Sequence, residues 1–158
     1  MYIHLSIMSE RIPGIVELPC ACASLRRAAR ALTQRYEAEL RPLRLRATQF
    51  TILQVLERAG ALLQGNLGRI LALDSTTLTR TLKIMLREGW IAERRGADRR
   101  QRLIMLTEAG REILGVATAR WQHTQEELRQ QLGDARWIDL FNITNEVTKL
   151  TTQEGELS

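Results

Sequence analysis

The sequence predicts a mainly α-helical protein that carries a single β-hairpin. The chain has 158 residues, which suffices for one domain with a hydrophobic core, and only 4% of them are aromatic. Apolar side chains recur every three to four residues through most of the chain, as on the buried face of a helix. One stretch breaks this pattern: RRGADRRQR, at 94–102, places five arginines around a glycine between two short apolar runs. These observations indicate helices on both sides of an exposed basic hairpin.

Most of the chain is expected to form six helices with apolar residues on one face. Their expected ranges are 20–40, 47–59, 64–71, 75–88, 107–132 and 134–150. Thr48 is expected to lie near the N-cap of the second helix. In the third helix, Gly65 and Gly68 each cost about 1 kcal/mol relative to alanine, and Leu63 stands where a capping side chain is usual. The start of the third helix therefore departs from the usual pattern.

The fourth helix has two chemically different faces. Asp74 precedes it and is a good N-cap, because a carboxylate accepts hydrogen bonds from the free amides of the first turn. Leu78, Leu82 and Met85 share one face at the spacing expected for burial. The opposite face carries hydroxyl and cationic side chains: Thr76, Thr77, Thr79, Arg80, Lys83 and Arg87. Such a helix suits the major groove of DNA, where hydroxyls and Arg80 reach base edges and phosphates.

The arginine-rich stretch is expected to form the loop of a hairpin between short strands at 90–93 and 103–106. Gly96 supplies the backbone freedom that a turn needs, and the arginines lie at the exposed tip. A basic tip can reach the neighbouring phosphate backbone or the minor groove, where a narrow groove concentrates negative potential. Together with the helix before it, the hairpin predicts a winged helix-turn-helix between flanking helices.

The distribution of charge points the same way. Residues 1–106 hold 18 basic and 9 acidic side chains, whereas residues 107–158 hold 5 basic and 9 acidic ones. The first region therefore suits a polyanion, although a basic surface can also bind an acidic protein or a membrane. No apolar run approaches the roughly 20 residues that a membrane span needs, and no signal peptide is recognisable at the start. We expect a cytoplasmic protein with no membrane partner.

An enzyme has little support in the sequence. The chain lacks a Gly-rich phosphate loop, a metal-binding spacing of His and Cys, and a nucleophile pair with its companion motif. The chain has only two histidines, His4 and His123, so it offers almost no side chain suited to act as a general base. We therefore expect neither catalysis, nor a metal, nor a cofactor.

Three stretches, in this order and spacing, resemble the MarR (multiple antibiotic resistance regulator) family of transcription factors. They are LRATQFTILQVL, LALDSTTLTRTLKIMLREGWIAE and RGADRRQRLIMLTEAGREIL, and the resemblance extends over about 20–150. It implies a homodimer that reads a pseudo-palindromic operator in double-stranded DNA, with half-sites about one helical turn apart. It also implies a division of the chain into an N-terminal extension (1–19), a dimerisation helix (20–41), a DNA-binding region (45–106) and two further dimerisation helices (107–151).

The resemblance assigns roles to individual positions. Thr76, Thr77, Thr79 and Arg80 match the recognition helix. Asp98 and Arg100 match an acidic-x-Arg pair at the wing tip, where the arginine enters the minor groove and the aspartate keeps the tip rigid. The expected DNA-binding residues are Ser75, Thr76, Thr77, Thr79, Arg80, Lys83, Arg95, Asp98, Arg99 and Arg100.

Two hypotheses remain open for Cys20 and Cys22. They are two small, partly buried residues at a helix start, or they form a redox switch as an intersubunit disulfide or a sulfenic acid. A helix N-terminus and the nearby Arg26 would favour the thiolate. A C-x-C pair cannot complete an ordinary metal site alone, and nothing places either histidine beside it.

The family resemblance also implies a small aromatic or anionic effector, bound between the dimerisation and DNA-binding parts. Arg26, Arg30 and Trp121 are reasonable lining residues, although Trp90, Trp121 and Trp137 are more readily explained as core or interface side chains. The function expected overall is a repressor released by a ligand or by cysteine oxidation. The alternatives are an activator of the same fold, or a non-regulatory winged-helix module that binds an acidic protein partner.

Overall fold

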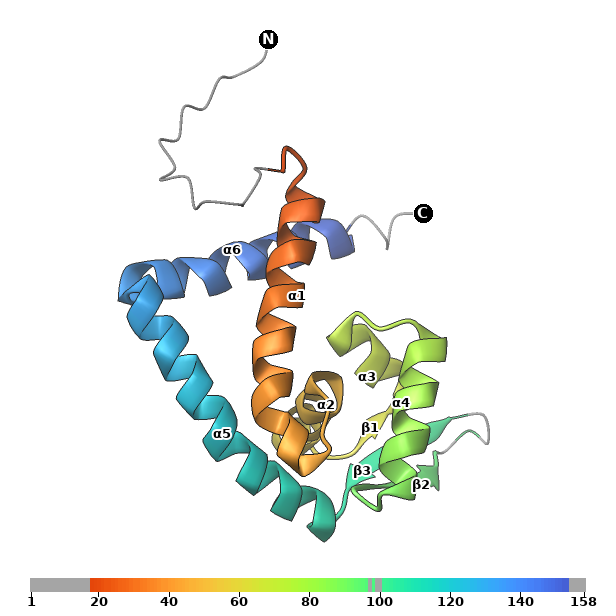
Figure 1. The fold of residues 1–158 in the computed structure, drawn as a ribbon. Coiled ribbons are helices and arrows are strands. Elements are labelled where there is room, and N and C mark those ends of the chain that lie inside the picture. Colours follow the sequence, from red (N-terminus) through yellow and green to blue (C-terminus); the bar gives the residue numbers. More distant parts are fainter. Residues whose placement is uncertain (1–17, 97, 99–100, 154–158) are drawn as a thin grey trace.

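The computed structural model describes residues 18–96, 98 and 101–153 and has the mainly helical fold with a small sheet that the sequence predicts (Figure 1). Most of the expected N-terminal extension, residues 1–17, lies outside the described residues, and so does His4. In chain order the elements are α1 (Ala21–Leu40), a 3-10 turn η1 (Arg41–Leu43), α2 (Ala47–Ala59), β1 (Leu62–Leu63), α3 (Gln64–Leu71), α4 (Ser75–Arg87), β2 (Ile91–Arg95), β3 (Arg102–Leu106), α5 (Glu108–Leu132) and α6 (Asp134–Gln153).

The sheet is antiparallel with the strand order β1-β3-β2. The sequence analysis missed β1, in which Leu62 pairs with Ile104 and Leu63 with Leu103. It also made the hairpin strands too short, because the ladder continues to a pair formed by Arg95 and Arg102. Arg94, Arg95 and Arg102 thus belong to the strands and are held in a fixed register.

The hydrophobic core lies between α2, α4, the sheet and the first half of α5. Its buried apolar residues are Leu40, Leu45, Phe50, Ile52, Leu53, Leu56, Leu67, Leu78, Leu82, Met85, Ile91, Ile104, Leu114 and Ala117. The expected stripe of α4 is confirmed, since Leu78, Leu82 and Met85 are all buried. The core therefore fixes the orientation of α4 and of the hairpin relative to α2 and α5.

Two local details refine the expectation. The N-cap of α2 is Arg46, two positions before Thr48, and the Arg46 backbone N–H donates to Oε1 of the buried Gln49, with N and O 2.9 Å apart. The Gln49 side chain, three positions into the helix, therefore satisfies the free backbone N–H of Arg46 at this end. In α3, Gly68 is buried, and a Cβ placed there would lie 3.3 Å from Leu78 Cδ2. This glycine lets α3 approach α4 closely, which offsets its low helix propensity.

Beyond this core extend α1, of which only Leu40 is buried, the second half of α5, and α6 (Figure 1). α1 packs along α5, and an ion pair joins Arg35 Nη2 to Glu127 Oε2 at 2.8 Å. Gly133, with a φ of +79°, ends α5, and α6 then leaves at a sharp angle. In the described part of the chain, no helix is both long and apolar enough to cross a membrane.

The α6 helix leaves most of its large apolar side chains uncovered in the single chain. No residue of α6 is buried up to residue 150, and its exposed apolar side chains are Ile138, Phe141, Ile143, Val147 and Leu150. Trp137 and Leu140 of α6 are half-buried, so the described part of the chain covers only a part of the apolar surface of this helix.

Candidate nucleic-acid interface

The start of α4 is fixed by its N-cap. The Asp74 carboxylate accepts two hydrogen bonds from Thr77: Oδ1 from the backbone N–H at 2.8 Å, and Oδ2 from the hydroxyl at 2.6 Å. The hydroxyl bond, followed by the backbone bond, holds the pKa of Asp74 below its ordinary value. The cap expected from the sequence is therefore present, and it holds the first turn of α4 in place.

The face of α4 opposite the core is exposed and polar. Leu78, Leu82 and Met85 anchor the helix to the core. All six predicted DNA-binding residues of the helix are exposed: Ser75, Thr76, Thr77, Thr79, Arg80 and Lys83. Five of them, all but Thr77, line one shallow hollow in the surface. The structure thus gathers hydroxyls and cations on a single accessible face, as direct readout in a major groove requires.

Two of the threonines already have partners within the chain. The Thr77 hydroxyl donates to Asp74, so this side chain completes the cap. Thr79 Oγ1 accepts a hydrogen bond of 3.0 Å from Gln64 Nε2, at the start of α3. The sequence analysis missed Gln64 as a neighbour of this face. The available signal was the position of Gln64 at the start of α3, directly after Leu63, because Leu63 cannot cap the helix with its side chain.

The hairpin places further arginines beside α4. β2 and β3 carry Arg94, Arg95 and Arg102 up to the turn, where the Gly96 N–H donates to the Gln101 carbonyl at 2.8 Å. The Asp98 carbonyl accepts from the Gln101 N–H at 2.9 Å, and the Asp98 side chain is exposed. The predicted wing-tip residues Arg99 and Arg100 lie outside the described residues. The described part of the wing confirms a tight turn that carries cations on both strands.

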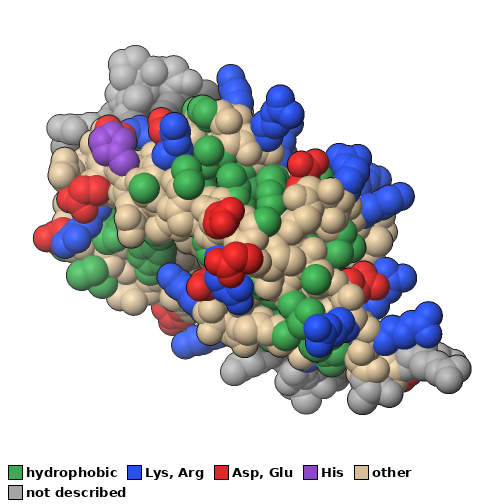
Figure 2. All heavy atoms as spheres, turned by 90° about the horizontal axis from the view of Figure 1, so that it is seen from below, with side chains coloured by type: hydrophobic (Ala, Val, Ile, Leu, Met, Phe, Trp, Pro, Cys, Tyr) green, Lys and Arg blue, Asp and Glu red, His purple; other side chains and the backbone are tan. Residues whose placement is uncertain are grey.

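Cations gather on the side of the molecule that carries these elements. Seen from below, Lys and Arg side chains are concentrated toward the right of the surface in Figure 2, which is the side on which Figure 1 places α4 and the hairpin. In the strand ladder, Arg95 lies opposite Arg102, and only Arg102 has an ion pair described, with Glu93 Oε2 at 3.4 Å from its Nη1. Like charges held opposite each other favour an anionic partner between or beside them.

Comparison with known proteins identifies this arrangement. The MarR family model matches residues 45–101. The solved structure of the M. tuberculosis transcriptional regulator MosR in complex with DNA is 35% identical, with a TM-score of 0.77, and the match covers 85% of this chain and 97% of that one. The chain belongs to the MarR family.

Two further relatives agree with this assignment. The overoxidized AbfR bound to DNA is 30% identical with a TM-score of 0.60, and the match covers 70% of this chain and 89% of that one. YwoH of Bacillus subtilis (strain 168), an uncharacterized HTH-type transcriptional regulator, is 26% identical over 110 residues, which cover 70% of this chain and 80% of YwoH. The protein is accordingly a winged-helix DNA-binding transcriptional regulator, and members of this family are regulators rather than enzymes.

The cysteines of this MarR-family chain are accessible. Cys20 is the N-cap of α1, without a side-chain hydrogen bond in that role, and Cys22 lies in the first turn. Both are exposed and neither is in a disulfide, so the expectation of partly buried residues is wrong for the single chain. Arg26 Nη2 donates to Cys22 Sγ at 3.3 Å, which confirms that this guanidinium lies beside the thiol. In the described residues, no group of three or more His, Cys, Asp and Glu is placed to hold a metal ion.

The three residues suggested for an effector pocket do not share one hollow. Arg26 and Arg30 line a hollow on α1 together with Leu18. Trp121 lines another, of about 560 Å³, between α2, α5 and α6. The walls of that second hollow include the aromatic rings of Trp121, Trp137 and Phe141, the guanidinium groups of Arg58 and Arg129, and the amide of Gln125. Within the single chain, the three expected residues therefore lie in two separate hollows, one on α1 and one between α2, α5 and α6.

Proposed function

We propose that this MarR-family regulator is a homodimeric repressor of a pseudo-palindromic operator, acting on DNA in the cytoplasm. The observation that carries the proposal is the exposed hydroxyl and cationic face of α4 beside an arginine-bearing hairpin. In each protomer, α4 enters a major groove and the wing reaches the adjacent minor groove. The structures of MosR and of AbfR bound to DNA support this arrangement, since both proteins share the fold at 30% identity or more.

The proposal divides the DNA contacts by chemistry. Ser75, Thr76, Thr79 and Arg80 meet base edges, because they line one exposed hollow on α4. The cations of the interface bind phosphates or the minor groove and release counterions, so that affinity falls steeply with salt. These cations are Lys83 on α4 and Arg95, Arg99 and Arg100 on the wing, with Asp98 holding the wing tip rigid.

The dimer is proposed from the uncovered face of α6. An amphipathic helix is stable when its apolar side is covered, and the apolar residues of α6 are exposed in the single chain. A second copy of the chain supplies the same apolar residues by symmetry. The two α4 helices of such a dimer then address two half-sites on one face of DNA.

Release from DNA is proposed to follow cysteine oxidation or the binding of a small aromatic or anionic ligand. Oxidation is supported by the exposed Cys20 and Cys22 and by the guanidinium of Arg26 beside Cys22. Peroxide would convert the Cys22 thiolate to a sulfenic acid with release of hydroxide, and condensation with a second thiol would give a disulfide and water. The ligand alternative is supported by the aromatic hollow around Trp121, beside the cationic Arg58.

The test is selection of bound sequences from a random duplex library, in reductant and again in mild peroxide. We expect a pseudo-palindrome to be enriched in reductant. A variant with Cys20→Ser and Cys22→Ser is the control for oxidation: it should keep binding in peroxide if wild-type binding is lost there. Equal binding of the wild type in both conditions would remove the cysteines from the mechanism and leave the ligand.

Enrichment of no sequence, with salt-sensitive binding to any duplex, would contradict an operator-specific repressor. Binding to an acidic protein without any affinity for DNA would support the interaction-module alternative instead.

A further inference from the structure

The recognition helix ends in a turn whose carbonyls face α5. Gly89, with a φ of +74°, follows α4, and its N–H donates to the Leu86 carbonyl at 3.1 Å. The Trp90 N–H donates to the Met85 carbonyl at 3.0 Å. These two hydrogen bonds, together with a glycine in the left-handed region, form the Schellman motif that commonly ends a helix. It holds the carbonyls of Gly89 and Trp90 in fixed positions at the junction between α4 and β2.

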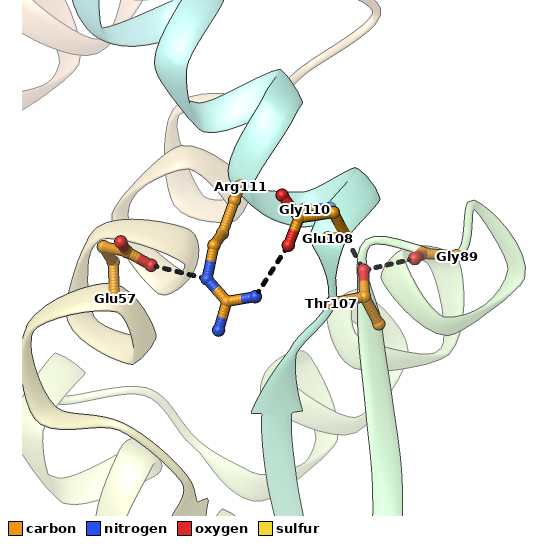
Figure 3. Close-up of polar contacts among 6 residues, drawn as sticks. All are labelled: Glu57, Gly89, Thr107, Glu108, Gly110 and Arg111. Carbon is orange, nitrogen blue, oxygen red and sulfur yellow. Dashed lines mark hydrogen bonds and ion pairs between the residues drawn. The ribbon is translucent and has the colours of Figure 1, made fainter.

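Thr107, the N-cap of α5, binds both of these carbonyls. Its hydroxyl donates to the Gly89 carbonyl at 2.7 Å (Figure 3), and its backbone N–H donates to the Trp90 carbonyl at 3.1 Å. The same hydroxyl oxygen accepts from the Gly110 N–H at 3.0 Å, which is the ordinary capping bond. One side chain thus joins the end of the recognition helix to the start of the longest helix described in the chain.

Gly110 makes this junction close. It is buried, and a Cβ placed on it would lie 2.1 Å from the Trp90 carbonyl oxygen and 2.7 Å from Leu106 Cδ1. Cβ atoms do not approach other heavy atoms closer than about 3.0 Å, so any side chain here requires a displacement of almost 1 Å. On one side the obstacle is the backbone carbonyl of Trp90, the residue directly before strand β2 of the wing.

A weaker contact, an ion pair, joins the first turn of α5 to α2. Arg111 lies with its Nε 3.6 Å from Glu57 Oε2 on α2, and with its Nη1 3.2 Å from Glu108 Oε2 (Figure 3). All three side chains are about half exposed or more, and exposed ion pairs contribute little. The junction therefore depends on Thr107 and Gly110, and the ion pairs are secondary.

We propose that Thr107 and Gly110 are positioning residues for DNA recognition, which set the angle between α5 and the unit formed by α4 and the wing. This inference rests on the proposed dimer, in which that angle fixes the separation of the two recognition helices. α5 has 25 residues, about 1.5 Å of length each, so a shift at its first turn is magnified along the helix. Symmetry applies the shift twice, and adjacent base pairs are only about 3.4 Å apart. The first turn of α5 thereby selects the half-site spacing without touching DNA.

The test compares two alanine substitutions on the same helix. Gly110→Ala introduces the clash, whereas Gly115→Ala adds the same methyl group where no atom lies within 4 Å of the Cβ. Both variants are assayed on the selected operator and on operators with one base pair added to or removed from the spacer. We expect Gly115→Ala to keep the wild-type affinity and spacing preference. Gly110→Ala should bind the wild-type spacing about tenfold more weakly and lose or change its preference.

A second pair of variants tests the junction without the clash. Thr107→Val removes the hydroxyl that binds Gly89 and Gly110 and keeps the branched shape, while Thr107→Ser retains the hydroxyl. We expect the valine variant to shift the spacing preference and the serine variant to retain it. This pair decides the matter if Gly110→Ala does not fold.

The outcomes separate the inference from the function on which it rests. If the wild type prefers one spacing, but folded Gly110→Ala and Thr107→Val keep that preference, the inference is overturned and the proposed function stands. If the wild type prefers no spacing at all, the proposed dimeric repressor is overturned, and the inference with it.

Discussion

The DNA-binding part of the chain and helix α6 both carry large apolar side chains, with opposite results. Every buried apolar residue of the core lies between Leu40 and Ala117, where α2, α4, the sheet and the start of α5 cover one another. α6 has a comparable set of large apolar side chains, and none of those described is buried. The difference teaches that apolar periodicity predicts which face of a helix becomes covered, but not by which chain. The DNA-binding part closes its core within one protomer, whereas most of the large apolar side chains of α6 stay exposed there.

Charge follows the same division. The chain is strongly basic up to the end of β3 and mildly acidic after it, with 18 basic and 9 acidic side chains against 5 and 9. In the proposed dimer, the two acidic regions would meet through the apolar side chains of α6, while the two basic regions would face one DNA duplex. The first turn of α5 is a place where these regions join, and its closest contacts are made by backbone and hydroxyl groups, with exposed ion pairs of Arg111 beside them.

The largest expected effect comes from substituting the same residue type in the two regions. Ile104 is fully buried in β3, whereas Ile138 on α6 is 57% exposed. Ile104→Ala should lower the free energy of unfolding by about 2–5 kcal/mol, because it removes core contacts and leaves a cavity. Ile138→Ala should leave the unfolding of the single chain almost unchanged and weaken dimerisation. Urea unfolding over a wide range of protein concentration, with sedimentation as a second measurement, distinguishes the two.

The contrast would be broken if Ile138→Ala destabilised the protein as much as Ile104→Ala at every concentration. α6 would then be covered within its own chain, and the proposed dimer interface would have to lie elsewhere.

Much of the fold was predictable because its signals are local. Asp74 and Thr107 mark the starts of α4 and α5, and Gly89 marks the end of α4, since caps and left-handed glycines act within one turn of a helix. The exposed face of α4 followed from helical periodicity alone. What failed depends on contacts between distant residues. The strand β1 exists because Leu62 and Leu63 pair with residues about forty positions later, which no local pattern reveals.

The site was predicted less completely for the same reason. The bond from Gln64 to Thr79 joins two helices, and neither residue alone indicates it. The suggested effector pocket combined Arg26 with Trp121, which the packing of α1 and α6 on α5 places in different hollows. Gly68 was interpreted as a cost to α3, because its close approach to α4 is visible only in the packed structure.

An intermediate effect is expected from removing one arginine in each region. Arg80→Ala removes a cation from the exposed face of α4, and Arg120→Ala removes one from the exposed surface of α5. Arg80→Ala should weaken operator binding by about 1–3 kcal/mol and, if Arg80 also neutralises a phosphate, lower the salt slope by about one. Arg120→Ala changes net charge equally and should leave operator affinity nearly unchanged. Fluorescence anisotropy over a range of salt measures both quantities, and equal losses in the two variants would mean that overall charge alone governs binding.

The smallest expected effect concerns the acid sensitivity of the recognition helix. The bonds from Thr77 lower the pKa of Asp74 in the folded protein, so its contribution to stability is present above its ordinary pKa. That contribution is lost as the pH falls through the lowered, folded value. Asp74→Asn keeps an oxygen that can accept from the Thr77 N–H but does not titrate, so its stability should fall less on acidification than that of the wild type. Urea midpoints measured from neutral to acidic pH give the comparison.

The matching variant in the other region is Glu127→Gln, because a hydrogen bond from Arg35 lowers the pKa of Glu127 between α1 and α5. Its stability should also fall less on acidification than that of the wild type. Any change in function should affect dimerisation for Glu127→Gln and operator binding for Asp74→Asn. If Asp74→Asn altered dimerisation and Glu127→Gln altered operator affinity, the two regions would be coupled through more than the first turn of α5. Separate effects would confine the coupling to Thr107 and Gly110, where the backbone of α5 meets the end of α4.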